Sequence, residues 1–288
     1  MSIAWLDGAF LPLAEARVSV LDRGFLLGDG VYEIVPVYSR RPFRLSAHLE
    51  RLQYSLDGIR LANPHPPESW AKLVNELIAR QDFDDQSLMI EITRGGPGAG
   101  DPLRDQAFPR AVWPTVLLFA QPLVLASVAQ KAAGVCAITA ADPRWAHCDI
   151  KAVSLLANVL MRQRAVEAGC AETILLCDGQ LAEGAASNIF VVIDGVLRTP
   201  APSPRMLSGI TRDVGLELAA AHGLAHRVGA VSESELRCAD EIWMTSSTRE
   251  IMPVVRLDGI RVGAGVPGPM ARQMDALYQQ FKQKVMRA

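Results

Sequence analysis

The pattern of apolar and polar positions predicts a chain that mixes helices with strands. Apolar residues recur at helical spacing of three and four in the segments 49–59, 70–78, 152–168, 209–222 and 269–286. Short runs rich in apolar and β-branched residues predict strands at 87–93, 112–120, 134–140, 172–177, 187–193 and 240–245. Because helices and strands do not alternate strictly, the pattern favours an α+β fold over a doubly wound parallel sheet.

The dipeptide Asp-Gly marks the clearest turns. Both central positions of a type I′ hairpin turn need a positive φ, which Asp and Gly tolerate. The pair recurs between strand-like runs at Asp7-Gly8, Asp178-Gly179, Asp194-Gly195 and Asp258-Gly259. We expect a β-hairpin at each of them.

A domain boundary is expected near residues 121–130. The strand pattern ends at Gln121-Pro122, and a stretch of polar and small residues follows before the next strand. The expected organisation is therefore a smaller N-terminal domain at 1–120, a linker at 121–130 and a larger C-terminal domain at 131–288.

Composition excludes several classes of function. Half of the 288 residues are hydrophobic and the net charge is −2, so the chain can bury a large core. Charges of both signs are interspersed, which argues against nucleic-acid or membrane-surface partners and for small molecules. The sequence shows neither a secretory signal nor an apolar run that could span a bilayer, so a cytoplasmic protein is expected.

The five cysteines do not form a recognisable framework. Their number is odd, they are widely spaced, and no Cys-x-x-Cys pair occurs. These features argue against both a disulfide framework and a zinc site, and no other metal site is indicated. We expect reduced thiols that are mostly buried.

Two residues could carry chemistry on an aromatic ring. Lys151 lies between a strand-like region and a helix expected to open at Ala152, and a lysine becomes a nucleophile once burial or a nearby cation removes its proton. Glu183 follows a hairpin and precedes Gly184 and two alanines, whose small size lets a flat ring approach. From spacing alone, an exposed structural lysine and a surface carboxylate remain the commoner alternatives.

Three further segments suit anions. Residues 207–212 form an expected helix start with Ser208 as its cap, and residues 245–248 are a cluster of hydroxyl side chains. Ordinary capping and turn formation would explain either segment separately. The glycine-rich loop 94–104 has an arginine at each end, which could clamp a carboxylate or simply form surface ion pairs.

Taken in order, these segments resemble the fold-type IV pyridoxal-phosphate (PLP) enzymes over nearly the whole chain. That class includes D-amino acid aminotransferases, branched-chain aminotransferases and aminodeoxychorismate lyases. The matching blocks are Leu21-Asp-Arg-Gly24, Gly28-Asp-Gly-Val-Tyr-Glu33, His48-Leu-Glu-Arg51-Leu52, Asp149-Ile-Lys151, Glu183-Gly184 with Ser187-Asn188, Gly209-Ile-Thr-Arg212 and Thr245-Ser-Ser-Thr248.

The resemblance implies a two-domain fold-type IV architecture whose C-terminal domain binds PLP. Lys151 would carry the cofactor covalently, and Glu183 would keep its pyridine nitrogen protonated. Arg51 would hold the phosphate, while His48 is expected on the helix surface. The supporting phosphate ligands would be Ile210, Thr211, Ser247 and Thr248.

The resemblance further implies ping-pong transfer of an amino group from an amino acid to a 2-keto acid, with Lys151 also moving the substrate proton. The D-amino acid branch, which acts on substrates such as D-alanine, is the closest match, and there Tyr32 and Arg104 would bind the α-carboxylate. Gln106 stands where histidine is common, so substrate preference could be atypical. A homodimer is expected from the same resemblance.

Alternatives stay open at this point. An aminodeoxychorismate lyase would use Lys151 to eliminate pyruvate, although Tyr32 and the arginine-containing loop argue against it. A branched-chain L-amino acid aminotransferase or an amine aminotransferase would share the same sequence blocks. A noncatalytic α+β binding protein would leave Lys151 and Glu183 as surface charges, which the joint match of the blocks disfavours.

Overall fold

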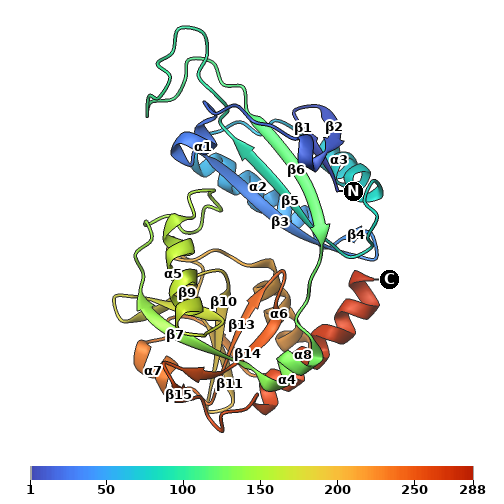
Figure 1. The fold of residues 1–288 in the computed structure, drawn as a ribbon. Helices are drawn as coiled ribbons and strands as arrows, with labels where there is room; N and C mark the ends of the chain where they lie inside the picture. The colour runs from blue at the N-terminus through green and yellow to red at the C-terminus, as the bar shows by residue number, and fades with distance from the viewer. Residues whose placement is uncertain (1, 288) are drawn as a thin grey trace. The chain divides into compact units, whose positions relative to one another are not determined.

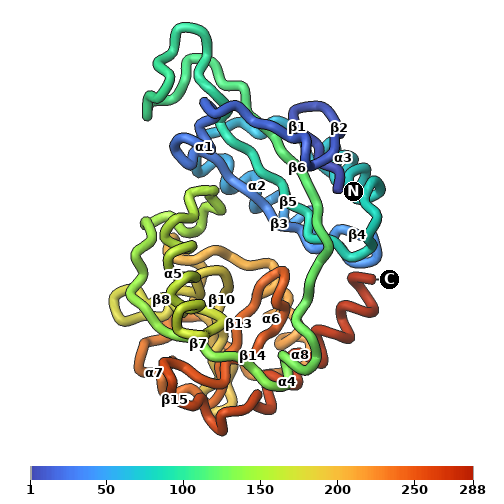
Figure 2. The backbone as a smooth tube through the Cα atoms, in the orientation of Figure 1, coloured from blue at the N-terminus to red at the C-terminus, as the bar shows by residue number. Residues whose placement is uncertain are grey.

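A computed structural model describes residues 2–287, which separate into two compact units (Figure 1). Unit 1 contains the residues up to Leu123, the segment Ile150–Ser154 and Arg287, and unit 2 contains Val124–Asp149 and Leu155–Met286. This differs from the expected division, because Ile150–Ser154 belongs to unit 1. Figure 2 follows the chain from unit 1 into unit 2 along the stretch expected to be a linker, which includes the end of one strand and the start of a helix.

Unit 1 is built on a six-stranded antiparallel sheet with the order β2-β1-β6-β5-β3-β4. Its helices α2 and α3 contribute the apolar positions that follow helical spacing in the sequence. The strands are β1 (Ile3–Leu6), β2 (Ala9–Pro12), β3 (Gly30–Tyr38), β4 (Arg41–Pro42), β5 (Gln86–Thr93) and β6 (Thr115–Pro122). The helices are η1 (Leu13–Glu15), α1 (Arg23–Leu27), α2 (Leu45–Gly58) and α3 (Pro67–Ala79).

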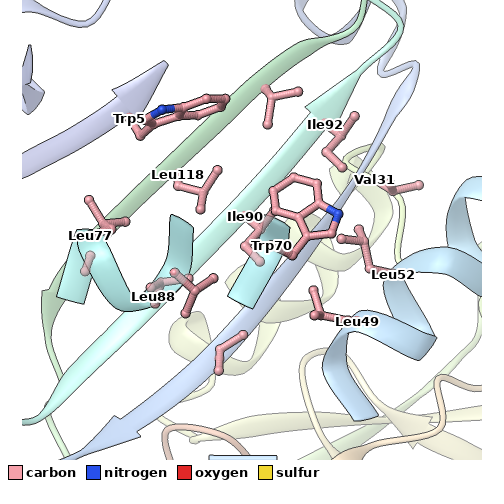
Figure 3. Close-up of a cluster of buried hydrophobic side chains, with 14 of the residues drawn as sticks. Trp5, Val31, Leu49, Leu52, Trp70, Leu77, Leu88, Ile90, Ile92 and Leu118 are labelled. Atoms are coloured by element: carbon pink, nitrogen blue, oxygen red, sulfur yellow. The ribbon is translucent and has the colours of Figure 1, made fainter. Parts of the chain in front are cut away.

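The core of unit 1 lies between α2, α3 and one face of this sheet. Figure 3 shows Trp70 of α3 and Leu52 of α2 beside Ile90 and other apolar side chains of β5. Ile150 packs against the same cluster. Burial of these side chains fixes α2 against the sheet, and α2 carries several of the candidate site residues.

The segment Ile150–Ser154 extends along the start of β3. Tyr32 N donates to Lys151 O over 2.9 Å, and Val153 N donates to Gly30 O over 3.0 Å. Ala152 forms an isolated antiparallel bridge with Val31. These long-range bonds explain why the helix expected from residue 152 begins only at Leu156.

Unit 2 contains a larger sheet with the order β12-β11-β10-β13-β14-β7-β8-β9, to which β15 is added beside β14. The strands are β7 (Val135–Ala141), β8 (Glu172–Cys177), β9 (Gln180–Gly184), β10 (Asn188–Ile193), β11 (Val196–Thr199), β12 (His226–Val228), β13 (Glu241–Ser246), β14 (Glu250–Leu257) and β15 (Ile260–Arg261). The helices are α4 (Val128–Ala133), α5 (Leu156–Glu167), α6 (Ile210–Ala221), α7 (Glu233–Arg237), α8 (Pro269–Phe281) and η2 (Lys282–Met286). Two sheets with flanking helices confirm the α+β fold class.

The local turn predictions are confirmed. All four Asp-Gly pairs join antiparallel strands, and both residues of each pair have positive φ, such as 51° at Asp178 and 73° at Gly179. The prediction of mostly buried thiols is wrong, because only Cys148 is buried and Cys238 is exposed. Within residues 2–287, the helices lack the length and apolar character that a membrane crossing requires.

Candidate active site

Lys151 is held at its backbone on three sides. Besides its carbonyl bond to Tyr32 N, its own N–H donates to Ser55 Oγ of α2 over 3.1 Å. Its Nζ lies 4.1 Å from the centroid of the Tyr32 ring, within the range of a cation–π contact. The amine therefore projects from a fixed point beside an aromatic face, and its side chain is half-buried.

A buried ion cluster lies on the neighbouring elements of unit 1. Arg51 of α2 grips Glu33 of β3 with two hydrogen bonds, Nε to Oε1 at 2.7 Å and Nη2 to Oε2 at 2.8 Å. His48 Nδ1 lies 2.8 Å from Glu33 Oε2. The Glu33 side chain is fully buried and that of His48 is 1% exposed, so the expectation that His48 lies on the helix surface is wrong.

The charges in this cluster follow from its surroundings. Burial alone would raise the pKa of Glu33, but the charge and hydrogen bonds of Arg51, with help from His48, lower it to about 2. Burial lowers the pKa of His48 against the opposing pull of Glu33, so the imidazole is neutral and its Nδ1–H donates. The bidentate grip of Glu33 fixes the plane of the Arg51 guanidinium.

Glu183 occupies a comparable position in unit 2. It lies in β9, is buried, and accepts a hydrogen bond at Oε1 from Arg144 Nη1 and at Oε2 from Asn188 Nδ2 and Leu207 N. Asp142 holds Arg144 from the other side through bonds of 2.8 and 2.9 Å. A carboxylate with these donors is oriented and stabilised as an anion, which suits it to face a protonated ring nitrogen.

Arg144 is a functional candidate that sequence reasoning missed. Burial would lower its pKa, but the hydrogen bonds and charges of Asp142 and Glu183 raise it, so it stays a cation. In the sequence it appears only as one arginine after a proline, at a distance of 39 residues from its partner Glu183. Local pattern gives no signal for such a pair.

The start of α6 offers backbone donors to an anion. Gly209 is the N-cap and gives no side-chain cap, so the prediction that Ser208 caps this helix is wrong. A Cβ at Gly209 would clash with Asn188 Oδ1, which belongs to the amide that also holds Glu183. Ile210 and Thr211, the first two helical residues, are buried. An uncapped helix start has free N–H groups and a positive partial charge, which together attract phosphate.

The remaining predicted residues lie in loops. Ser247 is half-buried and Thr248 is exposed in the turn between β13 and β14 of unit 2. Arg104 and Gln106 are exposed in the long loop between β5 and β6 of unit 1. The proposed carboxylate clamp at both ends of this loop is wrong for Arg94, because Arg94 is buried and binds Asp29 through two hydrogen bonds.

Each unit thus brings together a part of the predicted set. Unit 1 holds Tyr32 beside Lys151, together with Arg51, Arg104 and Gln106; unit 2 holds Glu183, Ile210, Thr211, Ser247 and Thr248. The set comprises an amine, two kinds of phosphate donor and a fixed buried carboxylate. These groups fit a cofactor that has a carbonyl group, a phosphate and a basic ring nitrogen.

Comparison with known proteins gives consistent matches over nearly the whole chain. The family model for amino-transferase class IV matches residues 30–257. The chain is 35% identical to the D-alanine aminotransferase of Bacillus licheniformis, over 95% of this chain and 94% of that protein, and 35% identical to that of Listeria monocytogenes, over 95% and 93%.

Among solved structures, the branched-chain amino acid aminotransferase of Escherichia coli matches with a TM-score of 0.88 and 28% identity, covering 99% of this chain and 94% of that one. A second branched-chain amino acid aminotransferase, that of T.th., is complexed with N-(5'-phosphopyridoxyl)-L-glutamate. It matches with a TM-score of 0.86 and 28% identity, covering 96% of this chain and 93% of that one.

Proposed function

We propose, because this chain belongs to the class IV aminotransferase family, that it uses PLP to transfer the amino group of a D-amino acid such as D-alanine to a 2-keto acid. Family membership follows from the match over residues 30–257 and from 35% identity to relatives over 95% of the chain. The observation that carries the proposal is Lys151, an amine held by backbone bonds at the start of β3.

Lys151 would serve as anchor and as proton carrier. Bound PLP withdraws electrons from the substrate α-carbon and carries the amino group between the two half-reactions. The Nζ of Lys151 binds the cofactor covalently, and once the substrate displaces it the free amine takes the α-proton and returns it on the cofactor side. Its bonds to Tyr32 and Ser55 keep this amine in one place throughout.

Arg51 and the start of α6 would hold the cofactor phosphate, with help from the hydroxyl groups of Ser247 and Thr248. The bidentate bond to Glu33 supports this role, because it leaves the guanidinium charged and fixed in direction. Ile210 and Thr211 add backbone N–H groups at the positive end of α6.

Glu183 would accept a hydrogen bond from the ring nitrogen of the cofactor. A carboxylate at that position keeps the nitrogen protonated, which preserves the electron-withdrawing power of the ring. Its bonds to Arg144, Asn188 and Leu207 N support the role, since they hold both oxygens in a fixed, ionised arrangement.

Tyr32, Arg104 and Gln106 would recognise the substrate carboxylate. An arginine offers two parallel N–H donors to a carboxylate, and a phenol adds a third donor. The side-chain amide of Gln106 can donate one uncharged hydrogen bond, which is weaker than the bond from a protonated imidazole. We therefore expect weaker carboxylate binding than with histidine at 106, and a wider range of substrates.

Two observations bear on stereochemistry. The D-alanine aminotransferases at 35% identity favour D-amino acids, whereas the structural match to the branched-chain aminotransferases at a TM-score of 0.88 favours an L-branched-chain substrate as the second candidate. Mixing the PLP form with single D- and L-amino acids and following its conversion to the pyridoxamine form separates them. Conversion by L-leucine but not by D-alanine would overturn the D-amino acid assignment.

The homodimer is also part of this proposal. Leu156, Val159 and Leu160 lie at helical spacing on α5 and are all more than half exposed, which leaves an apolar stripe that a second copy would cover. Sedimentation equilibrium should give the mass of two chains.

The test of the anchor is spectroscopic. The wild-type protein with PLP should absorb visible light, and borohydride should bleach this absorption and leave the cofactor attached to Lys151 in a peptide mass map. Lys151→Ala should lose both the adduct and the transfer activity. Lys72→Ala, which removes an exposed lysine from α3 of the same unit, is the control and should retain both. A reducible adduct in Lys151→Ala would refute the assignment.

A further inference from the structure

The loop between β5 and β6 is fastened to unit 1 by one buried arginine. This long loop projects from the sheet of unit 1 (Figures 1 and 2) and carries Arg104 and Gln106. Arg23 of α1 donates through Nη1 to Asp105 O at 2.6 Å and through Nη2 to Gln106 O at 3.3 Å. The guanidinium therefore holds two consecutive carbonyl groups directly after Arg104.

Asp29 fixes the direction of Arg23. Its Oδ2 accepts from Arg23 Nε at 2.8 Å, while its two oxygens also accept from Arg94 Nε and Nη2. Burial would raise the pKa of Asp29, but the hydrogen bonds and charges of Arg94 and Arg23 lower it, so the carboxylate is ionised. Arg94 is fixed in turn by Ile59 O and Arg60 O at the end of α2.

The loop has a second point of attachment at Phe108. Its ring lies 3.8 Å from the guanidinium carbon of Arg94 and 4.8 Å from that of Arg60. Both contacts are cation–π interactions, and they use the same Arg94 that binds Asp29. Arg104 and Gln106 thus lie on a short stretch that is held by Arg23 at one end and by Phe108 at the other.

We infer that Arg23 is a positioning residue for substrate recognition: the Asp29–Arg23 pair sets the place of the loop from which Arg104 and Gln106 reach the substrate carboxylate. The inference rests on the proposed function for the role of Arg104 and Gln106. Arg23 itself does not contact substrate. It acts by limiting the motion of the loop backbone, so that less conformational freedom is lost when a carboxylate binds.

Arginine is required for this role because of its shape. A guanidinium carries five donors in a planar fork, so it can bind a carboxylate with one edge and two carbonyl groups with the others. A lysine at 23 keeps the charge beside Asp29, but a single ammonium group on a flexible chain cannot hold both carbonyls in the same way. Arg23→Lys therefore separates loop positioning from charge.

The main experiment compares Arg23→Lys with Arg17→Lys. Arg17 also donates to two carbonyl groups, those of Ala14 and Ala16, but on an exposed turn. In Arg23→Lys we expect the KM for the amino acid and for the keto acid to rise about tenfold, as for the loss of one charged hydrogen bond, with kcat and the visible spectrum changed less than about twofold. Arg17→Lys should match wild type.

A second readout does not depend on substrate. Trypsin cleaves after exposed arginines in mobile segments, and Arg104 immediately precedes the carbonyl groups that Arg23 holds. Cleavage between Arg104 and Asp105 should become about tenfold faster in Arg23→Lys and stay unchanged in Arg17→Lys. If the wild-type protein transfers no amino group from any amino acid, the proposed function fails, whereas the tether is still tested by this cleavage rate.

Phe108→Leu provides a variant that leaves the buried ion cluster intact. Phe108 is partly exposed, so the variant should fold even if Arg23→Lys does not. It should raise both KM values and the cleavage rate in the same direction. Unchanged KM values or an unchanged cleavage rate in folded Arg23→Lys, or in Phe108→Leu if Arg23→Lys does not fold, would overturn the inference, as would an equal loss of kcat and of bound cofactor.

Discussion

Replacing Glu33 by glutamine should destabilise the protein by about 3 kcal/mol at neutral pH. The pKa of Glu33 falls from 4.5 to about 2 in the folded chain, and each unit corresponds to about 1.4 kcal/mol of stabilisation. Removal of one partner from a buried ion pair costs a similar amount, about 3–5 kcal/mol. The amide places an N–H₂ group where Arg51 or His48 already donates, so a donor would then face a donor.

The sign of the pH dependence follows from the direction of the shift. Because the pKa of Glu33 is lowered on folding, its stabilisation is complete above the unfolded value of about 4.5 and is lost as the pH falls towards about 2. The difference in stability between wild type and Glu33→Gln should therefore be constant between pH 5 and pH 7, within the range where both proteins stay folded.

Thermal unfolding at pH 7 gives the measurement. For a chain of this size, about 3 kcal/mol corresponds to a decrease in Tm of roughly 6–12 °C. Glu76→Gln makes the same chemical change on the surface of α3, where Glu76 pairs with Arg80 and both side chains are about half exposed; it should lower Tm by less than about 2 °C. Equal Tm values for the two variants would refute the reasoning that Glu33 is the buried partner that holds Arg51.

Two further predictions concern unit 2. Gly209→Ala should push the Asn188 amide away from Glu183, because the added Cβ would clash with Asn188 Oδ1; we expect a loss of about 1–3 kcal/mol in unfolding free energy, as for overpacking, together with weaker PLP binding in a fluorescence titration. Burial raises the pKa of Cys148 to about 11, so about one thiol in a thousand is ionised at pH 8. Iodoacetamide should therefore label the exposed Cys238 long before Cys148, as followed by mass spectrometry.

Sequence predicted the features that depend on neighbours in the chain. The Asp-Gly turns form where both residues tolerate a positive φ, and the apolar spacing of α2 and α3 matches the faces that these helices bury (Figure 3). The blocks around Lys151 and Glu183 likewise identified the family. In each of these cases the information lies within about ten consecutive residues.

Sequence did not predict the contacts between distant residues. His48 looks like a surface residue because helical spacing marks only the apolar face, whereas its burial depends on Glu33, which lies on a different element. Arg94 looks free in the sequence, but its partner Asp29 lies 65 residues away. Residues 152–155 look helical, yet bonds to β3 hold part of this segment in an extended form. Tertiary hydrogen bonds override local preference at all three places.

The return of residues 150–154 to β3 has a consequence for biosynthesis. A nascent chain that has emerged only as far as Leu123 contains the six strands of the first sheet but leaves the N–H of Tyr32 and the carbonyl of Gly30 without their partners. Translation of the 31 residues from there to Ser154 takes about 2–6 s at ordinary ribosome speeds. The first unit therefore cannot mature before part of the second has been translated, and a gene fragment ending at codon 123 would encode neither the missing strand nor the reactive amine.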